Sequence, residues 1–170
     1  MVRIIENLLP NEFIEAVINE KIHYGVGLQN HAGTIEQRAH TAHNHKGSSE
    51  HYVLIKKALD YLQDKTDIKV KNVERCKLNI INPMTVDSST LERMIHIDLD
   101  PYKDIKYNSL ICYLKGVDGD TVFFDNNKKE VFRYTPVIGN GVFFSSHMWH
   151  RPTPPIKQER MVINFVLETE

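Results

Sequence analysis

The stretch Met94-Ile95-His96-Ile97-Asp98 places an imidazole and a carboxylate two residues apart in a run that alternates as a β-strand does. Side chains two apart on a strand share a face. Met94, His96 and Asp98 are therefore expected on one face, with Ile95 and Ile97 on the apolar face opposite. A histidine and an acid that point together into a protein are candidates for one site.

Partners for this pair lie near the C-terminus. His147 and His150 belong to the run His147-Met148-Trp149-His150, and Arg160 opens the last apolar run. Two histidines and one carboxylate form the facial triad that suits non-haem Fe(II) and leaves coordination positions open. An open position is what oxygen chemistry requires, so the pattern favours an iron site.

Length and composition indicate one domain. The chain has 170 residues with 41% hydrophobic content, which is enough for one core and too little for two. We expect a single domain over 1–170, with helical support and a loop over 1–67 and a jelly-roll core over 68–170. The 21 basic and 22 acidic residues form no basic stripe, so nucleic acid is not indicated. Without an apolar span or a leader, we expect no membrane partner and a cytoplasmic location.

The first part of the chain predicts two helices and a long loop. A strand-like run over 2–9 precedes a helix over 11–20, and a second helix begins after Ser48 or Ser49 as its cap. Between them, the polar segment 23–47 lacks periodicity, and we predict a mobile lid or rim over 25–47. Its histidines, His40, His43 and His45, resemble a zinc clip in spacing, but we interpret them as solvated loop residues that line a substrate entrance.

The remainder of the chain predicts strands. Eight short apolar runs are separated by turn sequences, the count of a double-sheet jelly roll. The fold class expected is therefore mainly β within α+β, a cupin-like double-stranded β-helix with two N-terminal helices on one sheet. The predicted strands cover 73–81, 91–98, 109–114, 121–124, 130–134, 141–144, 148–151 and 160–167.

Strand parity suggests which side chains reach the interior. Arg160, Val162 and Asn164 share a face of the last strand, and Tyr113 belongs to an inward face of another. An interior cation is costly unless it is paired. Arg160 therefore either holds a ligand carboxylate or turns to solvent at the strand edge, and Tyr113 either donates to the same carboxylate or fills the core.

These motifs together resemble a known family. The arrangement of His96-Ile97-Asp98, His150 and Arg160, with the runs 111–114 and 119–124 between them, is similar to the Fe(II)- and 2-oxoglutarate-dependent dioxygenases. It most resembles their prolyl 4-hydroxylase branch, and the opening segment 4–13 is similar to that branch as well.

The resemblance implies roles for individual residues. His96, Asp98 and His150 would ligate iron, and Arg160 would bind the distal carboxylate of 2-oxoglutarate. The family's interval before the basic residue selects His150 over His147. Three further residues match positions near the cosubstrate: Tyr113, Asn164 and Asn82. Two of them depart from the family, because relatives often carry Tyr at the position of Asn82 and some carry Thr at that of Asn164.

The implied reaction is hydroxylation. The cofactors would be Fe(II), 2-oxoglutarate as cosubstrate and O2, with ascorbate as an accessory reductant. 2-Oxoglutarate would be converted to succinate and CO2 while an unactivated C–H of a peptide, protein or small molecule is hydroxylated. Two other interpretations remain open: a cupin-like metal-dependent isomerase or epimerase, and a non-catalytic jelly-roll binding module.

Overall fold

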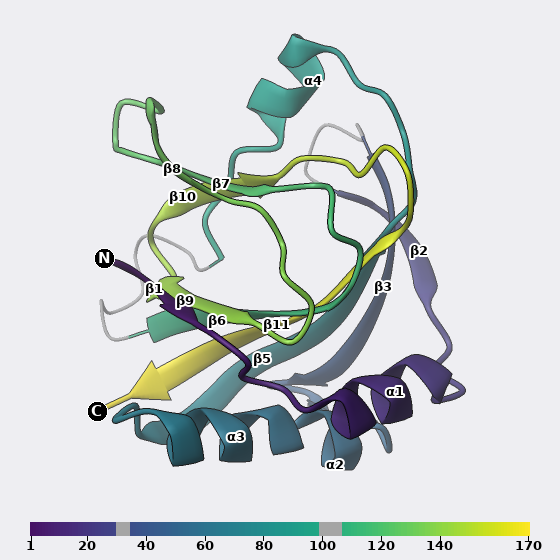
Figure 1. Cartoon of the computed structure of the whole chain (residues 1–170), viewed down its shortest axis with the longest axis vertical. Helices are drawn as coiled ribbons and strands as arrows, with labels where there is room; N and C mark the ends of the chain where they lie inside the picture. The colour runs from purple at the N-terminus through teal and green to yellow at the C-terminus, as the bar shows by residue number, and fades with distance from the viewer. Residues whose placement is uncertain (30–34, 99–106) are drawn as a thin grey trace.

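The computed structural model describes residues 1–29, 35–98 and 107–170. Within these ranges two antiparallel sheets face each other, and both chain ends lie on the same side of the molecule (Figure 1). The large sheet has the order β1-β9-β6-β11-β5-β3-β2, with β4 paired to β3. Its strands are β1 (Val2–Ile5), β2 (Gly25–Gln29), β3 (Ile35–Asn44), β4 (Gly47–Ser48), β5 (Val70–Ile81), β6 (Tyr107–Lys115), β9 (Gly141–Ser145) and β11 (Arg160–Thr169).

The small sheet has the order β10-β7-β8. Its strands are β7 (Thr121–Phe124), β8 (Glu130–Tyr134) and β10 (Trp149–Pro152). This double-sheet, mainly antiparallel arrangement confirms the predicted jelly-roll fold class. The predicted strands over 121–124 and 130–134 have the observed bounds, because turn sequences limit both of them.

Helices cover the outer face of the large sheet. Figure 1 shows α1 (Asn11–Asn19), α2 (Tyr52–Ile55) and α3 (Lys57–Lys65) along this face, opposite the small sheet. The expected second helix is thus divided in two. Ser48 and Ser49 do not cap it, because His51 is the N-cap residue and both serine hydroxyls contact histidines of β3.

β11 separates two apolar cores. Its outward side chains pack with the helices and with alternate residues of β5 and β6. Burial of each large apolar side chain contributes about 1.5–3 kcal/mol. Val162 faces the other way, into the core between the two sheets, with Phe123 and Phe144. The alternation predicted for this strand is confirmed, and it directs its polar residues between the sheets. The outward residues of β11 are Met161, Ile163, Phe165 and Leu167.

The segment predicted as a loop over 23–47 contains β2 and β3. β3 pairs with β5 and β2 pairs with β3, so both strands extend the large sheet. The lid expected over 25–47 is therefore wrong for these strands. Residues 30–34 lie outside the described residues. The prediction missed these strands because their polar residues obscure the alternation. The first 67 residues therefore supply sheet as well as helix.

The strand predicted over 91–98 is also wrong. Residues 88–93 form a short helix, α4 (Ser88–Arg93), whose N-cap Asp87 accepts a hydrogen bond from the Thr90 amide at 2.7 Å. After it, His96 makes only an isolated bridge to His150. Among the described residues no helix combines the length and the apolar character needed to cross a lipid bilayer.

Candidate metal centre and active site

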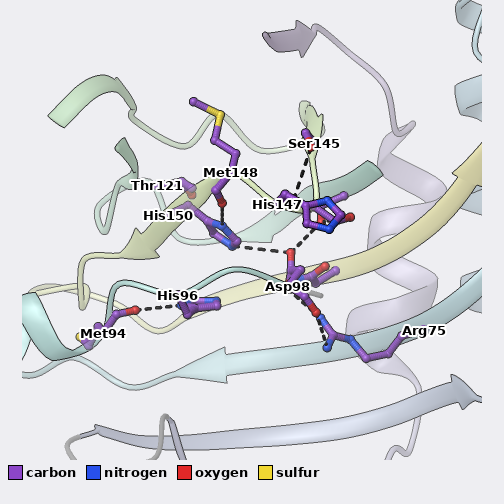
Figure 2. Close-up of polar contacts among 12 residues, drawn as sticks. Arg75, Met94, His96, Asp98, Thr121, Ser145, His147, Met148 and His150 are labelled. Carbon is purple, nitrogen blue, oxygen red and sulfur yellow. Dashed lines mark hydrogen bonds and ion pairs between the residues drawn. The ribbon is translucent and has the colours of Figure 1, made fainter. Parts of the chain in front are cut away.

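His96 and His150 are brought together by the backbone. The amide of each donates to the carbonyl of the other at 2.9 Å, so that His96 lies beside β10 although it belongs to no strand. The two ring centroids are 4.5 Å apart. The bridge thus places two imidazoles from distant parts of the chain side by side, as Figure 2 shows.

Both imidazoles are held in the same way. Nδ1 of His96 lies 2.8 Å from the Met94 carbonyl, and Nδ1 of His150 lies 2.9 Å from the Met148 carbonyl. A carbonyl only accepts, so each Nδ1 carries the proton and donates it. Each Nε2 therefore keeps a free lone pair, which is the form in which histidine binds a metal.

Asp98 completes the cluster with two differently used oxygens. Its side chain is 3% exposed. Oδ1 accepts from Arg75 at 2.6 Å and from Asn164 at 3.2 Å. Oδ2 accepts from Ser109 at 2.7 Å and lies 3.6 Å from Nε2 of His150. The carboxylate is therefore fixed from β5, β6 and β11 while one oxygen faces the imidazoles.

Protonation states in the cluster suit a divalent cation. Burial alone raises the pKa of the Asp98 carboxyl, but the charges of His150, Arg75 and His96 lower it to about 2. Burial, reinforced by the neighbouring His96, lowers the pKa of His150 to about 4. At neutral pH the site thus offers a carboxylate and a neutral imidazole, the forms that metal binding needs.

Ligand atoms of His96, Asp98 and His150 all lie within 4.8 Å of one another. In the described part of the chain this is the one group of three or more such residues close enough to hold a metal ion. Two imidazoles and one carboxylate are the ligand set of a non-haem Fe(II) site with open positions. The three residues selected from the sequence are therefore adjacent in space.

The cluster opens into a cavity of about 340 Å³ between the sheets. Ile97 was expected on the face opposite His96 and Asp98, but it lines the same cavity as they do. The reason is that residues 94–98 do not form a regular strand. Met94 packs instead against Ile81. Polar and charged lining residues other than the three candidate ligands are Gln37, Arg75, Lys77, Asn79, Thr121, Arg160 and Asn164.

Arg160 lies in the wall of the same cavity and is 4% exposed. Its Nη2 donates to Thr121 Oγ1 at 3.0 Å, whereas its Nε is buried without a hydrogen-bond partner. Gly119 leaves room for this side chain: its φ is +97°, and an added Cβ would lie 3.3 Å from Arg160 Cδ and 2.9 Å from the Thr153 carbonyl oxygen. Burial lowers the pKa of the Arg160 guanidinium, because a charged group is disfavoured away from water.

Tyr113 stands behind Arg160. It is fully buried, its hydroxyl hydrogen-bonds Thr121 Oγ1 at 2.7 Å, and its ring lies 5.6 Å from the Arg160 guanidinium carbon. Burial raises the pKa of Tyr113 to about 12, so the hydroxyl keeps its proton. Tyr113 therefore supports Thr121 and Arg160 while filling the core.

The two asparagines selected from the sequence differ in position. Asn164 lines the cavity and contacts Asp98, four residues along β11 from Arg160. Asn82 is exposed and its Oδ1 accepts from Arg38 at 3.3 Å. The structure does not bring Asn82 to the cavity, whereas Asn79 of the same strand lines it.

Four other histidines considered from the sequence, His147, His40, His43 and His45, do not belong to the ligand group. His147 precedes β10 in a turn, and both its ring nitrogens are buried without a hydrogen-bond partner. His40 and His43 belong to β3. Nε2 of His40 lies 2.9 Å from the Ser49 hydroxyl, and the ring of His43 stacks on that of Tyr52 with centroids 4.6 Å apart, while His45 is exposed. Within the described ranges these three do not form a metal-ligand group, and none of them lines the cavity.

Sequence reasoning missed Arg75, Lys77, Asn79 and Thr121. The first three lie on β5 with the same parity, so the period of two would have placed them on one face. What the sequence lacked was the side of the sheet on which that face lies. Thr121 opens β7 directly after the Gly119 turn, without a motif to mark it.

Comparisons with known proteins were informative only for structure. No family model and no curated protein sequence matches the chain. Solved structures do match. A Pseudomonas putida prolyl-4-hydroxylase is 16% identical with a TM-score of 0.65, covering 98% of this chain and 91% of that one.

Two other matches extend the comparison. The viral collagen prolyl hydroxylase of Paramecium Bursaria Chlorella virus-1, a 2OG complex, is 20% identical with a TM-score of 0.60, covering 98% and 94% of the two chains. A Trichoplax adhaerens prolyl hydroxylase, in complex with a peptide fragment of the hypoxia inducible factor oxygen degradation domain, is 14% identical with a TM-score of 0.64, covering 98% and 83%. The chain has the fold of the 2OG-Fe(II) oxygenases. The 2OG-Fe(II) oxygenase fold confirms the resemblance predicted from the sequence motifs.

Proposed function

We propose that this protein is an Fe(II)- and 2-oxoglutarate-dependent dioxygenase that hydroxylates a C–H bond of a peptide or small molecule. One observation carries the proposal: the group His96, Asp98 and His150 lines the same cavity as the buried cation Arg160. A facial ligand set and an anion-binding group facing one space are what a metal and an acidic cosubstrate require together.

The donor set fits iron. His96 and His150 present Nε2, and Asp98 presents Oδ2, while their other polar atoms are held by neighbouring groups. Three protein ligands leave positions for the 2-oxoacid and for O2. When bound, Fe(II) would activate O2 as 2-oxoglutarate is converted to succinate and CO2 and one oxygen atom enters the substrate C–H bond.

The Arg160 end of the cavity fits a carboxylate. Arg160 makes no ion pair with any described residue, and its Nε faces no acceptor. A buried guanidinium is costly without an anion, and its planar fork binds a carboxylate through two parallel hydrogen bonds. Arg160 would therefore hold the distal carboxylate of 2-oxoglutarate, with Thr121 and Tyr113 fixing its orientation.

Apolar residues shield the site from water. His150 is 2% exposed and its ring lies against those of Phe123 and Phe144, at 6.2 and 4.8 Å between centroids. Ile111 and Val162 add apolar surface to the same cavity. Exclusion of water around a strong oxidant limits side reactions, so these residues would protect turnover.

Support for a prolyl-type peptide substrate comes from fold alone. The matched Trichoplax adhaerens enzyme carries a peptide fragment, and two others are named as prolyl hydroxylases. We therefore place peptides among the candidate substrates. Ascorbate would act as an external reductant that sustains turnover, and assays should compare its presence and absence.

Succinate release tests the proposal. Purified protein with Fe(II), 2-oxoglutarate and O2 should form succinate, with candidate substrates scored for one added oxygen by mass. Asp98→Ala should abolish both products, because it removes a ligand from a three-ligand site. A substrate conversion that proceeds without O2 and 2-oxoglutarate would instead establish the isomerase interpretation.

A further inference from the structure

β5 contributes a polar wall to the cavity. Alternate residues of this strand, Cys76, Leu78 and Ile80, pack under the helices, and the residues between them point the other way. We define the β5 wall as Arg75, Lys77 and Asn79, which all line the cavity. Two cations on an interior face need anions nearby.

Among the cations that line the cavity, Lys77 is the one without a hydrogen-bond or ion-pair partner in the described part of the chain. Arg75 donates to Asp98 through both its carboxylate and its carbonyl, and Arg160 donates to Thr121. Lys77 is half-buried and makes no hydrogen bond or ion pair with a residue the structure describes. Burial lowers the pKa of its ammonium group and the charge of Arg75 lowers it further, whereas the charge of Asp98 raises it only in part.

Unpaired amide oxygens lie around Lys77. Across the strands its neighbour is Asn164, which is 8% exposed and donates to Asp98 at 3.2 Å. Oδ1 of Asn164 and Oδ1 of Asn79 are both buried without a hydrogen-bond partner. Buried polar groups of this kind are normally satisfied, so they indicate a ligand beside Lys77.

This ligand is distinct from the carboxylate expected at Arg160. On β5 the residue opposite Arg160 is Ile81, and the residue opposite Asn164 is Lys77. Four residues of a strand span roughly 13 Å at about 3.3 Å per residue. Lys77 therefore lies at the end of the cavity near Asp98, where the substrate must approach the metal.

Charge balance favours an anion there. Of the described residues, the lining cations are Arg75, Lys77 and Arg160, and the lining carboxylate is Asp98. Fe(II) and the 2-oxoglutarate dianion carry opposite charges of equal size, so they leave this excess of positive charge unchanged. Excess positive charge on the walls of a cavity attracts a ligand of opposite sign.

We propose that the substrate carries a carboxylate or similar oxyanion that pairs with Lys77, with its neighbouring polar groups bound by Asn79 and Asn164. The inference rests on the proposed function, whose chemistry it restricts to acidic substrates. In the reaction, 2-oxoglutarate, O2 and the acidic substrate R–H yield succinate, CO2 and R–OH. The oxyanion takes no part in bond making and orients the C–H bond.

A direct test uses methanesulfonate, an oxyanion that coordinates metals weakly, and dimethyl sulfone, its neutral analogue. The protein is first loaded with Mn(II) and 2-oxoglutarate, and the paramagnetic relaxation of each probe's methyl protons is then measured. Methanesulfonate should show saturable relaxation and dimethyl sulfone should not. Lys77→Met should weaken methanesulfonate binding by about tenfold or more, which corresponds to a loss of about 1.4 kcal/mol of binding free energy.

Matched variants separate charge from folding. Lys77→Arg should retain methanesulfonate binding, and Lys71→Met, at an exposed position on the same strand, should leave it unchanged. Equal relaxation of the two probes, or unaltered methanesulfonate binding in Lys77→Met, would overturn the assignment. Weaker 2-oxoglutarate binding in Lys77→Met would also overturn it, because Lys77 would then serve the cosubstrate.

Loading the protein with Mn(II) and 2-oxoglutarate distinguishes a failure of the proposed dioxygenase function from a failure of the proposed oxyanion site at Lys77. If Mn(II) and 2-oxoglutarate do not bind before the probe is added, the proposed function itself is wrong. Substrate-stimulated succinate release then identifies the source of the anion. L-amino acids compared with their amides represent free acids, and peptides with Glu or Gln at one position represent acidic peptides. Preference for the acid in either pair supports the proposal, and equal rates in both pairs contradict it.

Discussion

His96 and His150 exchange two backbone hydrogen bonds of 2.9 Å and thereby hold their imidazoles side by side. The bridge ties the segment after α4 to the small sheet and sets the spacing of two candidate ligands through the backbone, with the ring centroids 4.5 Å apart. Asp98 follows two residues later, and its amide donates to the Ser146 carbonyl at 3.0 Å. Backbone pairing on both segments therefore fixes all three residues before a metal arrives.

This arrangement predicts which late histidine binds metal. His150→Ala should lose tight Fe(II) binding and all 2-oxoglutarate turnover, because one of three ligands is removed. His147→Ala should retain both within a few-fold, since His147 lies outside the cluster. Iron titration of the two variants measures the difference. Metal-free His147→Ala together with metal-bound His150→Ala would show that the ligand assignment is wrong.

Arg160 is predicted to determine cosubstrate affinity. Arg160→Ala should keep metal binding but lose about 2–5 kcal/mol of 2-oxoglutarate binding, because the ligand carboxylate would be buried without a partner. Arg160→Lys should recover only part of it, since an ammonium cannot form the paired hydrogen bonds of a guanidinium. Calorimetric titration tests this, with exposed Arg3→Ala as the control. Unchanged affinity in Arg160→Ala would refute the cosubstrate site.

Thr121 is predicted to act through Arg160. Its hydroxyl accepts from Arg160 and contacts the Tyr113 hydroxyl, so Thr121→Val leaves buried polar groups unpaired while preserving volume. We expect a loss of about 1–3 kcal/mol, distributed between 2-oxoglutarate binding and folding stability. Titration with 2-oxoglutarate and thermal unfolding measure the two parts. Wild-type values for both would exclude this supporting role.

Arg75 is predicted to position Asp98. Arg75→Met removes the 2.6 Å contact to Oδ1 and should weaken metal binding by about 10–100-fold, the usual effect of losing a group that orients a ligand. The metal affinity of exposed Arg3→Met should be unchanged. Competition with a chelator provides the measurement. Tighter metal binding in Arg75→Met would mean that Arg75 opposes the metal by its charge.

The strands that build the core were predictable because their alternation is strong. In β11 the apolar residues face the helices and Arg160, Val162 and Asn164 face the cavity, as the period of two predicts. Residues 88–93 misled the prediction, since the Asp87 cap outweighs a few strand-forming residues. β3 was missed because its polar residues contact other segments of the chain, as Arg38 contacts Glu159 and His40 contacts Ser49, and so they interrupt the apolar alternation.

Contacts between residues far apart in the chain could not be predicted from the sequence. His96 and Asp98 were found from residue type and spacing, and His150 was chosen by the interval to Arg160 that the family resemblance implies. The contact between Arg75 and Asp98 depends instead on the packing of β5 beside the segment after α4. Asn82 was selected by its place before Pro83, yet the strand ends there and its side chain faces Arg38. Local pattern does not determine such orientations.

The thermal stability of the protein with Mn(II), with 2-oxoglutarate and with both tests the metal site and the cosubstrate site together. A ligand that binds only the folded state stabilises it by about 2.7 kcal/mol at one hundred times its Kd. 2-Oxoglutarate would bind both Arg160 and the metal. We therefore expect a large stabilisation only when Mn(II) and 2-oxoglutarate are present together. Equal stabilisation by 2-oxoglutarate with and without Mn(II), or none at all, would contradict it.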